Sequence, residues 1–351
     1  MIIKKDSSWK RNLLDRDSKI KDAIKILNKC KTKIVLVTEN NLKLLGTITN
    51  GDIRRNLIRG YTKEDSIIYI INKSPLSTKS KVSQKKIMNL MIKNKINSIP
   101  IINPNSKKIS GLYVLQNHKN NIKKNTIILI MAGGKGKRLL PLTKKIPKPM
   151  LKISGKPMAE KLITKASKEG FKNFIFSVNY LSDKIINYFK NGKKLGVKIQ
   201  YIKESRPLGT AGSIAFLDKF KFENIIVINC DVVTNLKLND FLLFHSTHKQ
   251  IATVASIIHE TKNQFGIIKT KGSRLIEMVE KPLQKNYVNA GIYAFNKKIL
   301  KYIIKNEKAD INNLFKKIIK YKKKIIVYPL HEPWADIGVH KELRKVNKKN
   351  K

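Results

Sequence analysis

The chain has 351 residues and carries 74 lysines and arginines against 24 acidic residues, which gives a formal net charge of +50. Hydrophobic residues make up 41% of the chain, too many for a disordered protein and enough for two or three domains of ~150 residues each. No apolar run approaches the ~20 residues that span a bilayer, and the N-terminus lacks the apolar core of a signal peptide. The two cysteines, Cys30 and Cys230, exclude a disulfide framework, so we expect a cytoplasmic protein.

The positive charge has two interpretations. Clustered basic residues would attract a nucleic acid or an anionic membrane. Lysine is instead spread along the whole chain together with isoleucine and asparagine, residues that A/T-rich codons encode, and the last residues, KVNKKNK, alone resemble a basic tail. A dedicated binder concentrates its charge. We therefore expect no specific nucleic-acid partner and no membrane partner, with a nucleic-acid-binding protein as the alternative.

The first third of the chain contains an internal repeat. Aligned without gaps at an offset of 65 residues, Val37 matches Ile102 and Gly46 matches Gly111. Each copy shows an apolar strand, a polar turn and a second apolar strand, and each follows a segment with helical periodicity. The repeat predicts a small pseudo-symmetric α/β unit, built twice from helix, strand, strand and helix, in which the second copy covers the apolar face of the first.

The polar stretch that ends the repeat predicts a domain boundary. We expect a first domain over residues 1–118, a linker over 119–125 and a second domain over 126–351. In the second domain apolar strands alternate with helices, which is typical of a mostly parallel sheet covered on both faces and binding ligands beyond the carboxyl ends of its strands. The expected strands are 127–131, 173–178, 197–202 and 224–229, and the expected helices are 156–169, 182–189 and one from about residue 210.

A glycine-rich segment follows the first of these strands. Gly133, Gly134 and Gly136 let the backbone approach a ligand and point amide N–H groups at phosphate oxygens. Arg138 can hold a phosphate through two parallel hydrogen bonds, and Lys148, between two prolines, can act as a point charge. The spacing is neither that of a P-loop nor that of a dinucleotide fingerprint.

The complete string, MAGGKGKRLLPLT followed by PKPM, resembles the signature of the sugar-1-phosphate nucleotidyltransferases. The resemblance continues in register through PLGTAG, NCD, FG, EKP, NAG and WADIG, and it is strongest to the mannose-1-phosphate guanylyltransferases. It implies a Rossmann-like, GT-A-like α/β domain that transfers a nucleotidyl group from a nucleoside triphosphate to a hexose- or hexosamine-1-phosphate and releases pyrophosphate. Lys137 departs from the pattern, which usually has Thr or Ser there, and adds a cation beside the loop.

The resemblance also implies roles for individual residues. Arg138 would bind the β- and γ-phosphates, Lys148 would neutralise the α-phosphate, and Asp231 and Asp336 would hold Mg²⁺, which prefers oxygen ligands. The residues implied in nucleotide binding are Ala132, Gly133, Gly134, Gly136, Glu204, Gly209 and Thr210. Those implied in binding the sugar phosphate are Gly266, Glu280, Lys281 and Asn289.

Glu204 bears on the identity of the base. It lies just before PLGTAG, where a residue of this family meets the Watson–Crick edge of the base. Guanine offers two adjacent donors there, and a carboxylate can accept both, whereas uracil and thymine offer one donor between two carbonyls. We therefore hypothesise GTP as the substrate. Uridylyl or thymidylyl transfer by the same fold and a surface position for Glu204 remain the alternatives.

The N-terminal repeat resembles a tandem pair of cystathionine-β-synthase (CBS) domains, best in the string LGTITNGDIRR. In such pairs a Thr and an Asp hold the ribose of an adenine nucleotide, which places Thr49 and Asp52 in that role, whereas the second copy has Val114 and Asn117. The pair would regulate the enzyme or stabilise a homo-oligomer. A catalytically silent regulator that binds nucleotides is the alternative to an enzyme.

Overall fold

The computed structural model describes residues 2–30, 32–40, 42–80, 82–94, 96–116, 123 and 125–349. The chain divides into two units, Met1–Asn120 and Asn121–Lys351, and each is described by itself. Most of the expected linker, 119–125, and Asn117 of the second repeat lie outside the described residues.

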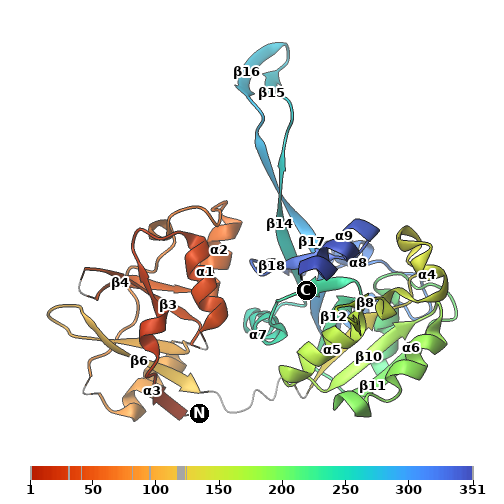
Figure 1. Ribbon diagram of the computed structural model, residues 1–351, viewed down its shortest axis with the longest axis horizontal. Helices are drawn as coiled ribbons and strands as arrows, with labels where there is room; N and C mark the ends of the chain where they lie inside the picture. The colour runs from red at the N-terminus through yellow and green to blue at the C-terminus, as the bar shows by residue number, and fades with distance from the viewer. Residues whose placement is uncertain are drawn as a thin grey trace. The chain divides into compact units, whose positions relative to one another are not determined.

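The first unit contains the predicted helix, strand and strand twice (Figure 1). The closing helix is present in the first copy, whereas its expected counterpart after residue 116 lies outside the described residues. The first copy contains α1 (Ile20–Lys29), β3 (Ile34–Glu39), β4 (Lys43–Thr49) and α2 (Asn50–Ile58), and the second contains α3 (Gln84–Lys93), β5 (Ser98–Ile102) and β6 (Ile109–Gln116). Two short strands, which the repeat did not predict, complete the sheets. β1 (Ile2–Lys5) pairs antiparallel with β6, and β2 (Leu13–Asp15) pairs parallel with β3.

The apolar faces of the two copies pack together, as the repeat predicts. Ile34 and Leu36 of β3 form one buried cluster with Ile109 and Leu112 of β6. Neither three-stranded sheet could bury its apolar face alone, so each copy supplies half of a shared core.

The gapless alignment of the two copies is correct for the second strand but wrong by one residue for the first strand, where Val37 corresponds to Ile101. In the first copy Val37 lies opposite Gly46, just before a β-bulge. In the second copy Ile101, not Ile102, lies opposite Gly111 and just before the equivalent bulge. The segment between these paired residues is therefore one residue longer in the second copy.

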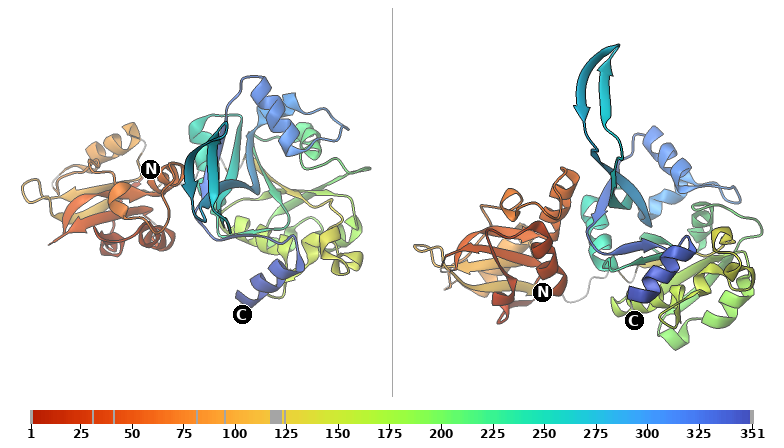
Figure 2. Two further views of the ribbon diagram at one scale, coloured as in Figure 1. Left: turned by 90° about the horizontal axis from the view of Figure 1, so that it is seen from above. Right: turned by 45° about the horizontal axis from the view of Figure 1, so that its top comes forward.

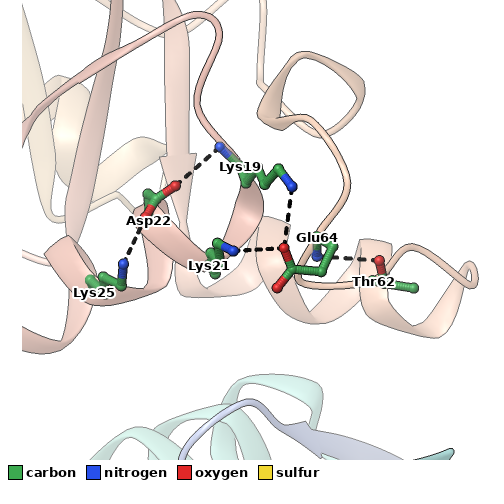
Figure 3. Close-up of polar contacts among 6 residues, drawn as sticks. All are labelled: Lys19, Lys21, Asp22, Lys25, Thr62 and Glu64. Carbon is green, nitrogen blue, oxygen red and sulfur yellow. Dashed lines mark hydrogen bonds and ion pairs between the residues drawn. The ribbon is translucent and has the colours of Figure 1, made fainter.

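Charged side chains connect the start of α1 to the segment that follows α2 (Figure 3). The Glu64 carboxylate accepts from Lys21 Nζ at 2.7 Å and from Lys19 Nζ at 3.3 Å. Asp22 accepts from Lys25 Nζ at 2.9 Å and from the backbone N–H of Lys19 at 3.3 Å. These acids offset part of the local positive charge, and hydrogen bonding to the lysines lowers the pKa values of Glu64 and Asp22.

The second unit contains a seven-stranded sheet in the order β11-β10-β7-β12-β17-β14-β18. Its strands are β7 (Thr126–Met131), β10 (Asn173–Val178), β11 (Lys198–Lys203), β12 (Asn224–Asn229), β14 (Ala252–Lys262), β17 (Leu283–Asn296) and β18 (Ile325–Leu330). The first four strands in this order run parallel, and β17 runs antiparallel to both of its neighbours. The prediction of a mostly parallel α/β sheet is confirmed.

Helices cover both faces of this sheet (Figure 2). The helices are α4 (Leu142–Lys145), α5 (Met158–Lys168), α6 (Ser182–Phe189), α7 (Leu238–His248), α8 (Ile311–Lys320) and α9 (His340–Lys349), and small strand pairs are formed by β8 (Lys152–Ile153) with β9 (Lys156–Pro157) and by β13 (Val232–Thr234) with β19 (Trp334–Asp336). The segment after residue 210, expected to be a helix, is a 3₁₀ helix over Gly212–Lys219.

The interior strand β7 shows why this sheet is buried on both sides. Ile128 and Ile130 of β7 join the apolar core on one face, and Ile127 and Leu129 join the core on the other. Such a continuous apolar run is typical of a parallel strand between two helical layers. Within the described residues, no helix is both long enough and apolar enough to cross a bilayer.

Two strands of the sheet continue beyond it as a two-stranded ribbon. β14 and β17 stay paired as far as Lys262 opposite Leu283, and β15 (Ile267–Lys271) and β16 (Arg274–Val279) form the far end (Figures 1 and 2). The apolar side chains Phe265 and Met278 are 74% and 63% exposed. The ribbon thus extends away from the two cores of this unit.

Acid should destabilise the second unit through a buried histidine. His245 of α7 is 1% exposed, and its Nδ1 lies 2.8 Å from Thr253 Oγ1. Burial lowers the pKa of His245 to about 4, whereas in the unfolded chain it is ~6.5. Between these values the unfolded state binds more protons, so stability falls as the pH falls, by at most ~3 kcal/mol.

The measurement is urea unfolding of the full chain at pH 7 and at pH 4.5. His245→Gln should reduce the difference between the two free energies of unfolding, whereas His259→Gln, at an exposed position on the ribbon, should leave it as in the wild type. An equal pH dependence in all three proteins would show that His245 does not cause it.

Candidate functional site

A cavity of about 420 Å³ lies at the carboxyl ends of the parallel strands of the second unit. Four segments of the chain line it: the glycine-rich loop after β7, the segments after β11 and β12, and Gly338 after β19 (Trp334–Asp336). The residues that line it are Met131, Gly133, Gly134, Gly136, Lys137, Arg138, Lys148, Glu204, Pro207, Gly209, Thr210, Asn229, Cys230, Asp231 and Gly338. The structure therefore brings together most of the residues implied in binding a nucleotide, at the edge where an α/β sheet binds its ligands.

The glycine-rich loop is fixed by hydrogen bonds from both backbone and side-chain groups. Ala132 is buried, and its N–H donates to Ser177 O at 2.8 Å. Gly136 has a φ of +62°, and a Cβ there would lie 2.9 Å from Thr143 Cγ2. The Thr143 hydroxyl in turn donates to Gly136 O at 2.9 Å. Position 136 therefore requires glycine, and the backbone of the loop stays close to the cavity.

The two implied metal carboxylates lie side by side. β13 and β19 pair antiparallel with Val232 opposite Asp336, and the N–H of Ile337 donates to Asp231 O at 3.0 Å. Asp231 also forms an ion pair with Lys148 Nζ. Burial raises the pKa of Asp336, and the neighbouring charge of Asp231 raises it further. Asp231 lines the cavity, whereas Asp336 lies next to Asp231 and is not among the lining residues. The two close carboxylates carry an electrostatic cost that a cation would offset.

These carboxylates fit a hard divalent cation. Asp336 Oδ1 is buried, and within the described residues it has no hydrogen-bond partner, so an acceptor is available for a ligand. In the part of the chain that the structure describes, no group of three or more His, Cys, Asp or Glu side chains could hold a metal. An ion here would complete its coordination with substrate oxygens and water, as Mg²⁺ usually does.

Arg138 lies against a glycine that the sequence reasoning did not assign to the site. A Cβ at Gly338 would lie 3.3 Å from both terminal nitrogens of the Arg138 guanidinium. Gly338 also lines the cavity. Gly338 is the last residue of the WADIG motif, from which only Asp336 was predicted to be a site residue.

The segment after β11 combines contacts to the cavity with contacts to α8. Gly209 has a φ of +76°, and a Cβ there would lie 2.5 Å from Asp310 Oδ1. The Thr210 hydroxyl accepts from the N–H of Ile311 at 2.9 Å, at the start of α8. Glu204 lines the cavity, and its N–H donates to Val178 O at 2.9 Å. Gly209 and Thr210 therefore anchor the loop to α8 as well as lining the cavity.

The residues implied in sugar-phosphate binding lie elsewhere. Gly266, Glu280 and Lys281 belong to the ribbon and are not among the residues that line the cavity. The Glu280 and Lys281 side chains are 67% and 53% exposed and pair at 3.7 Å. Asn289, at the base of the ribbon, donates through Nδ2 to the Tyr293 hydroxyl at 2.7 Å. The structure gathers these residues along β14–β17, and none of the four is among the residues that line the cavity.

In the first unit, Thr49 and Asp52 bond to each other. The Thr49 N–H and hydroxyl donate to Asp52 Oδ2 at 2.8 and 2.7 Å, which forms a capping box at the start of α2. A cavity of about 810 Å³ in this unit lies instead beside Val114, the counterpart of Thr49 in the second copy, and Leu115. Basic residues line it as well, namely Lys4, Lys5, Arg11 and Lys29.

Comparison with known proteins identifies the family. Residues 127–351 match the family model for nucleotidyl transferases. The chain belongs to this family. Residues 13–59, which span the first copy of the repeat, match the family model for the CBS domain. The resemblance to the nucleotidyltransferases is confirmed, and the resemblance to CBS domains is confirmed for the first copy of the repeat.

Individual relatives agree with this assignment. A mannose-1-phosphate guanyltransferase of Pichia angusta is 33% identical over 223 residues, 61% of this chain and 61% of that protein. A UTP–glucose-1-phosphate uridylyltransferase of Synechocystis is 29% identical over 230 residues, 60% of this chain and 59% of that protein. The crystal structure of HddC from Yersinia pseudotuberculosis, complexed with GMP-PN, covers 64% of this chain and 99% of that chain, with 27% identity and a TM-score of 0.51. The chain thus spans about three fifths of the length of the first two relatives.

Gly338→Ala should weaken anion binding in the nucleotidyltransferase cavity. The added Cβ would contact the guanidinium of Arg138 and displace it by a few tenths of an ångström. We expect the affinity for tripolyphosphate, measured by isothermal titration calorimetry, to fall about 3- to 10-fold, because a small misplacement of a charged group lowers its contribution steeply. In an Arg138→Ala background the same change should have no further effect. Equal effects in both backgrounds would show that Gly338 acts independently of Arg138.

Proposed function

We propose that this nucleotidyltransferase acts on a sugar-1-phosphate. An oxygen of the sugar phosphate attacks the α-phosphorus of a nucleoside triphosphate, a new P–O bond forms, the bond between the α-phosphorus and the bridging oxygen breaks, and pyrophosphate leaves. The observation that carries the proposal is the cavity in which the glycine-rich loop, Arg138, Lys148 and Asp231 converge. The names of the relatives support the same reaction class.

The charged side chains are suited to the steps of this reaction. We assign Arg138 to the β- and γ-phosphates and to the leaving pyrophosphate, since a guanidinium binds phosphate oxygens through paired donors. We assign Lys148 to the α-phosphate. Its partner in the structure is Asp231, so Lys148 is positioned at the carboxylates when no phosphate competes for it.

Asp231 and Asp336 are proposed to hold Mg²⁺. When bound, this ion would neutralise phosphate charge and orient the triphosphate. The two carboxylates, with the unpartnered Oδ1 of Asp336 described above, provide oxygen ligands of the required kind. The free thiols Cys30 and Cys230 fit a reducing compartment, and we propose a cytoplasmic location.

We propose GTP as the nucleotide. Glu204 lines the cavity and can accept from both donors on the edge of guanine. Two of the proteins compared above support this choice, because one is named a mannose-1-phosphate guanyltransferase and the other was crystallised with GMP-PN. The uridylyltransferase relative makes UTP the nucleotide to test against GTP.

For the sugar phosphate we propose Gly266, Glu280, Lys281 and Asn289. The Lys281 ammonium would pair with the phosphate and the Glu280 carboxylate would accept from sugar hydroxyls. None of the four lines the cavity, so this assignment requires either that the sugar phosphate binds outside the cavity lining or that the ribbon moves toward it.

The decisive experiment measures pyrophosphate release with Mg²⁺. GTP, UTP, dTTP and ATP are each combined with mannose-, glucose- and N-acetylglucosamine-1-phosphate. We expect release with GTP and one sugar, and a loss of at least about 100-fold in Asp231→Asn, because a neutral amide binds the cation weakly and leaves Lys148 unpaired. Asp218→Asn, which removes an exposed acid paired with Lys305 at 3.1 Å, should retain wild-type activity. No Mg²⁺-dependent release with any pair would refute the proposal in favour of a silent nucleotide-binding regulator.

For the first unit we propose a regulatory adenine nucleotide at Thr49 and Asp52. The ribose hydroxyls would donate to the Asp52 carboxylate, which already accepts from the Thr49 hydroxyl and pairs with Arg55. Asp52→Ala should weaken binding of AMP or ATP to the full chain about tenfold, as measured by calorimetry in the presence of saturating tripolyphosphate to occupy the second unit. Undiminished binding in Asp52→Ala would exclude this site.

A further inference from the structure

Glu204 is held in place by protein donors on both of its carboxylate oxygens. The Ser177 hydroxyl donates to Oε1, and the backbone N–H of Leu208 donates to Oε2 at 3.1 Å. The backbone of Glu204 is fixed as well, since Asn179 Nδ2 donates to its carbonyl oxygen at 2.7 Å. Rotation of the carboxylate would break one bond or the other.

Ser177 is a buried polar residue in an apolar strand, and its hydrogen bond to Glu204 accounts for its presence there. Ser177 belongs to β10, whose sequence NFIFSV is otherwise apolar after the first residue, and it is 0% exposed. It lies opposite Met131 in β7 and opposite Ile202 in β11. A buried hydroxyl among apolar neighbours is costly unless it is hydrogen bonded, and Glu204 is its acceptor.

The carboxylate faces the glycine-rich loop with acceptor capacity to spare. A Cβ at Gly133 would lie 3.4 Å from Oε2 and 3.5 Å from Oε1, and both residues line the cavity. A carboxylate oxygen can accept about two hydrogen bonds. With one protein donor on each oxygen, each retains one position for a donor from a ligand in the cavity.

We propose that Ser177 is a positioning residue that sets base specificity, by orienting Glu204 so that its two oxygens meet the two adjacent donors of a 2-amino-6-oxopurine. This inference rests on the proposed function, because it concerns the nucleotide of the same site. It adds a buried residue that does not itself line the cavity and assigns to each carboxylate oxygen one protein donor and one donor from the base.

The test compares GTP with ITP, whose hypoxanthine base differs from guanine by the missing 2-amino group. Dissociation constants are measured by calorimetry on the full chain, so that the test does not depend on turnover. We expect the wild type to bind GTP about 10-fold or more tightly than ITP, since a hydrogen bond to a charged group contributes this much. Ser177→Ala should bring the two constants within about threefold of each other by weakening GTP binding.

Two further variants make the result specific. Ser213→Ala removes an equally buried hydroxyl, which donates to Met131 Sδ at 3.5 Å, and it should preserve the preference for GTP. Ser177→Cys nearly preserves the side-chain volume but donates weakly, so it should also lose the preference if Ser177→Ala fails to fold. In a Glu204→Gln background, Ser177→Ala should have no further effect, whereas a merely structural role would persist there.

Several results would overturn the inference. These are an unchanged ratio of GTP to ITP affinity in both Ser177 variants, an equal loss of GTP, ITP and UTP binding, or a wild type that binds UTP more tightly than GTP. Failure of the proposed function would look different, because pyrophosphate release would be missing with every pair of substrates while the preference for GTP over ITP persisted.

Discussion

The antiparallel pairing of β13 with β19 is the constraint on which the cavity depends. It joins a segment just after β12 to one more than 100 residues later and brings Asp336 beside Asp231. The same pairing places Gly338 against Arg138. The C-terminal segment therefore contributes the acidic residue Asp336 and also contacts the guanidinium of Arg138. Leu343 and Val346 of α9 pack with Leu139 in a separate apolar cluster, which fixes the segment from its other side. Opposite charges therefore meet in one cavity because three distant parts of the chain are packed together.

Much of the second unit could be predicted from the sequence. The bounds of β10 and β12 agree with the prediction, because each strand is an apolar run between polar residues. The glycine-rich loop could be placed at a strand end for the same reason. The 3₁₀ helix over Gly212–Lys219 could not, because its geometry depends on a distant segment: a Cβ at Gly212 would lie 2.8 Å from Glu307 O.

Other features could not be predicted from the sequence because they depend on contacts between residues that are far apart along the chain. β1 and β2 are short, and their partners, β6 and β3, are remote in sequence. Ser177 could not be recognised as a partner of Glu204, because the sequence around a single serine in an apolar strand does not indicate which group accepts its hydrogen bond. For Glu280 and Lys281, the motif indicated a role, but their position depends on the direction in which a long ribbon leaves the sheet. Local pattern therefore predicted the elements, and long-range packing decided which side chains meet.

The strand β1 has a consequence for how the first unit is made and kept intact. β1 pairs with β6, so residues 2–5 and 113–116 are neighbours in one sheet. On the ribosome the second sheet therefore stays incomplete until β6 has emerged, which raises the contact order of this unit and slows its folding. Proteolytic removal of the first few residues would expose the edge of β6 as an unpaired template for another strand. The opening segment of the chain thus protects the first unit against edge-to-edge aggregation, although it precedes both copies of the repeat.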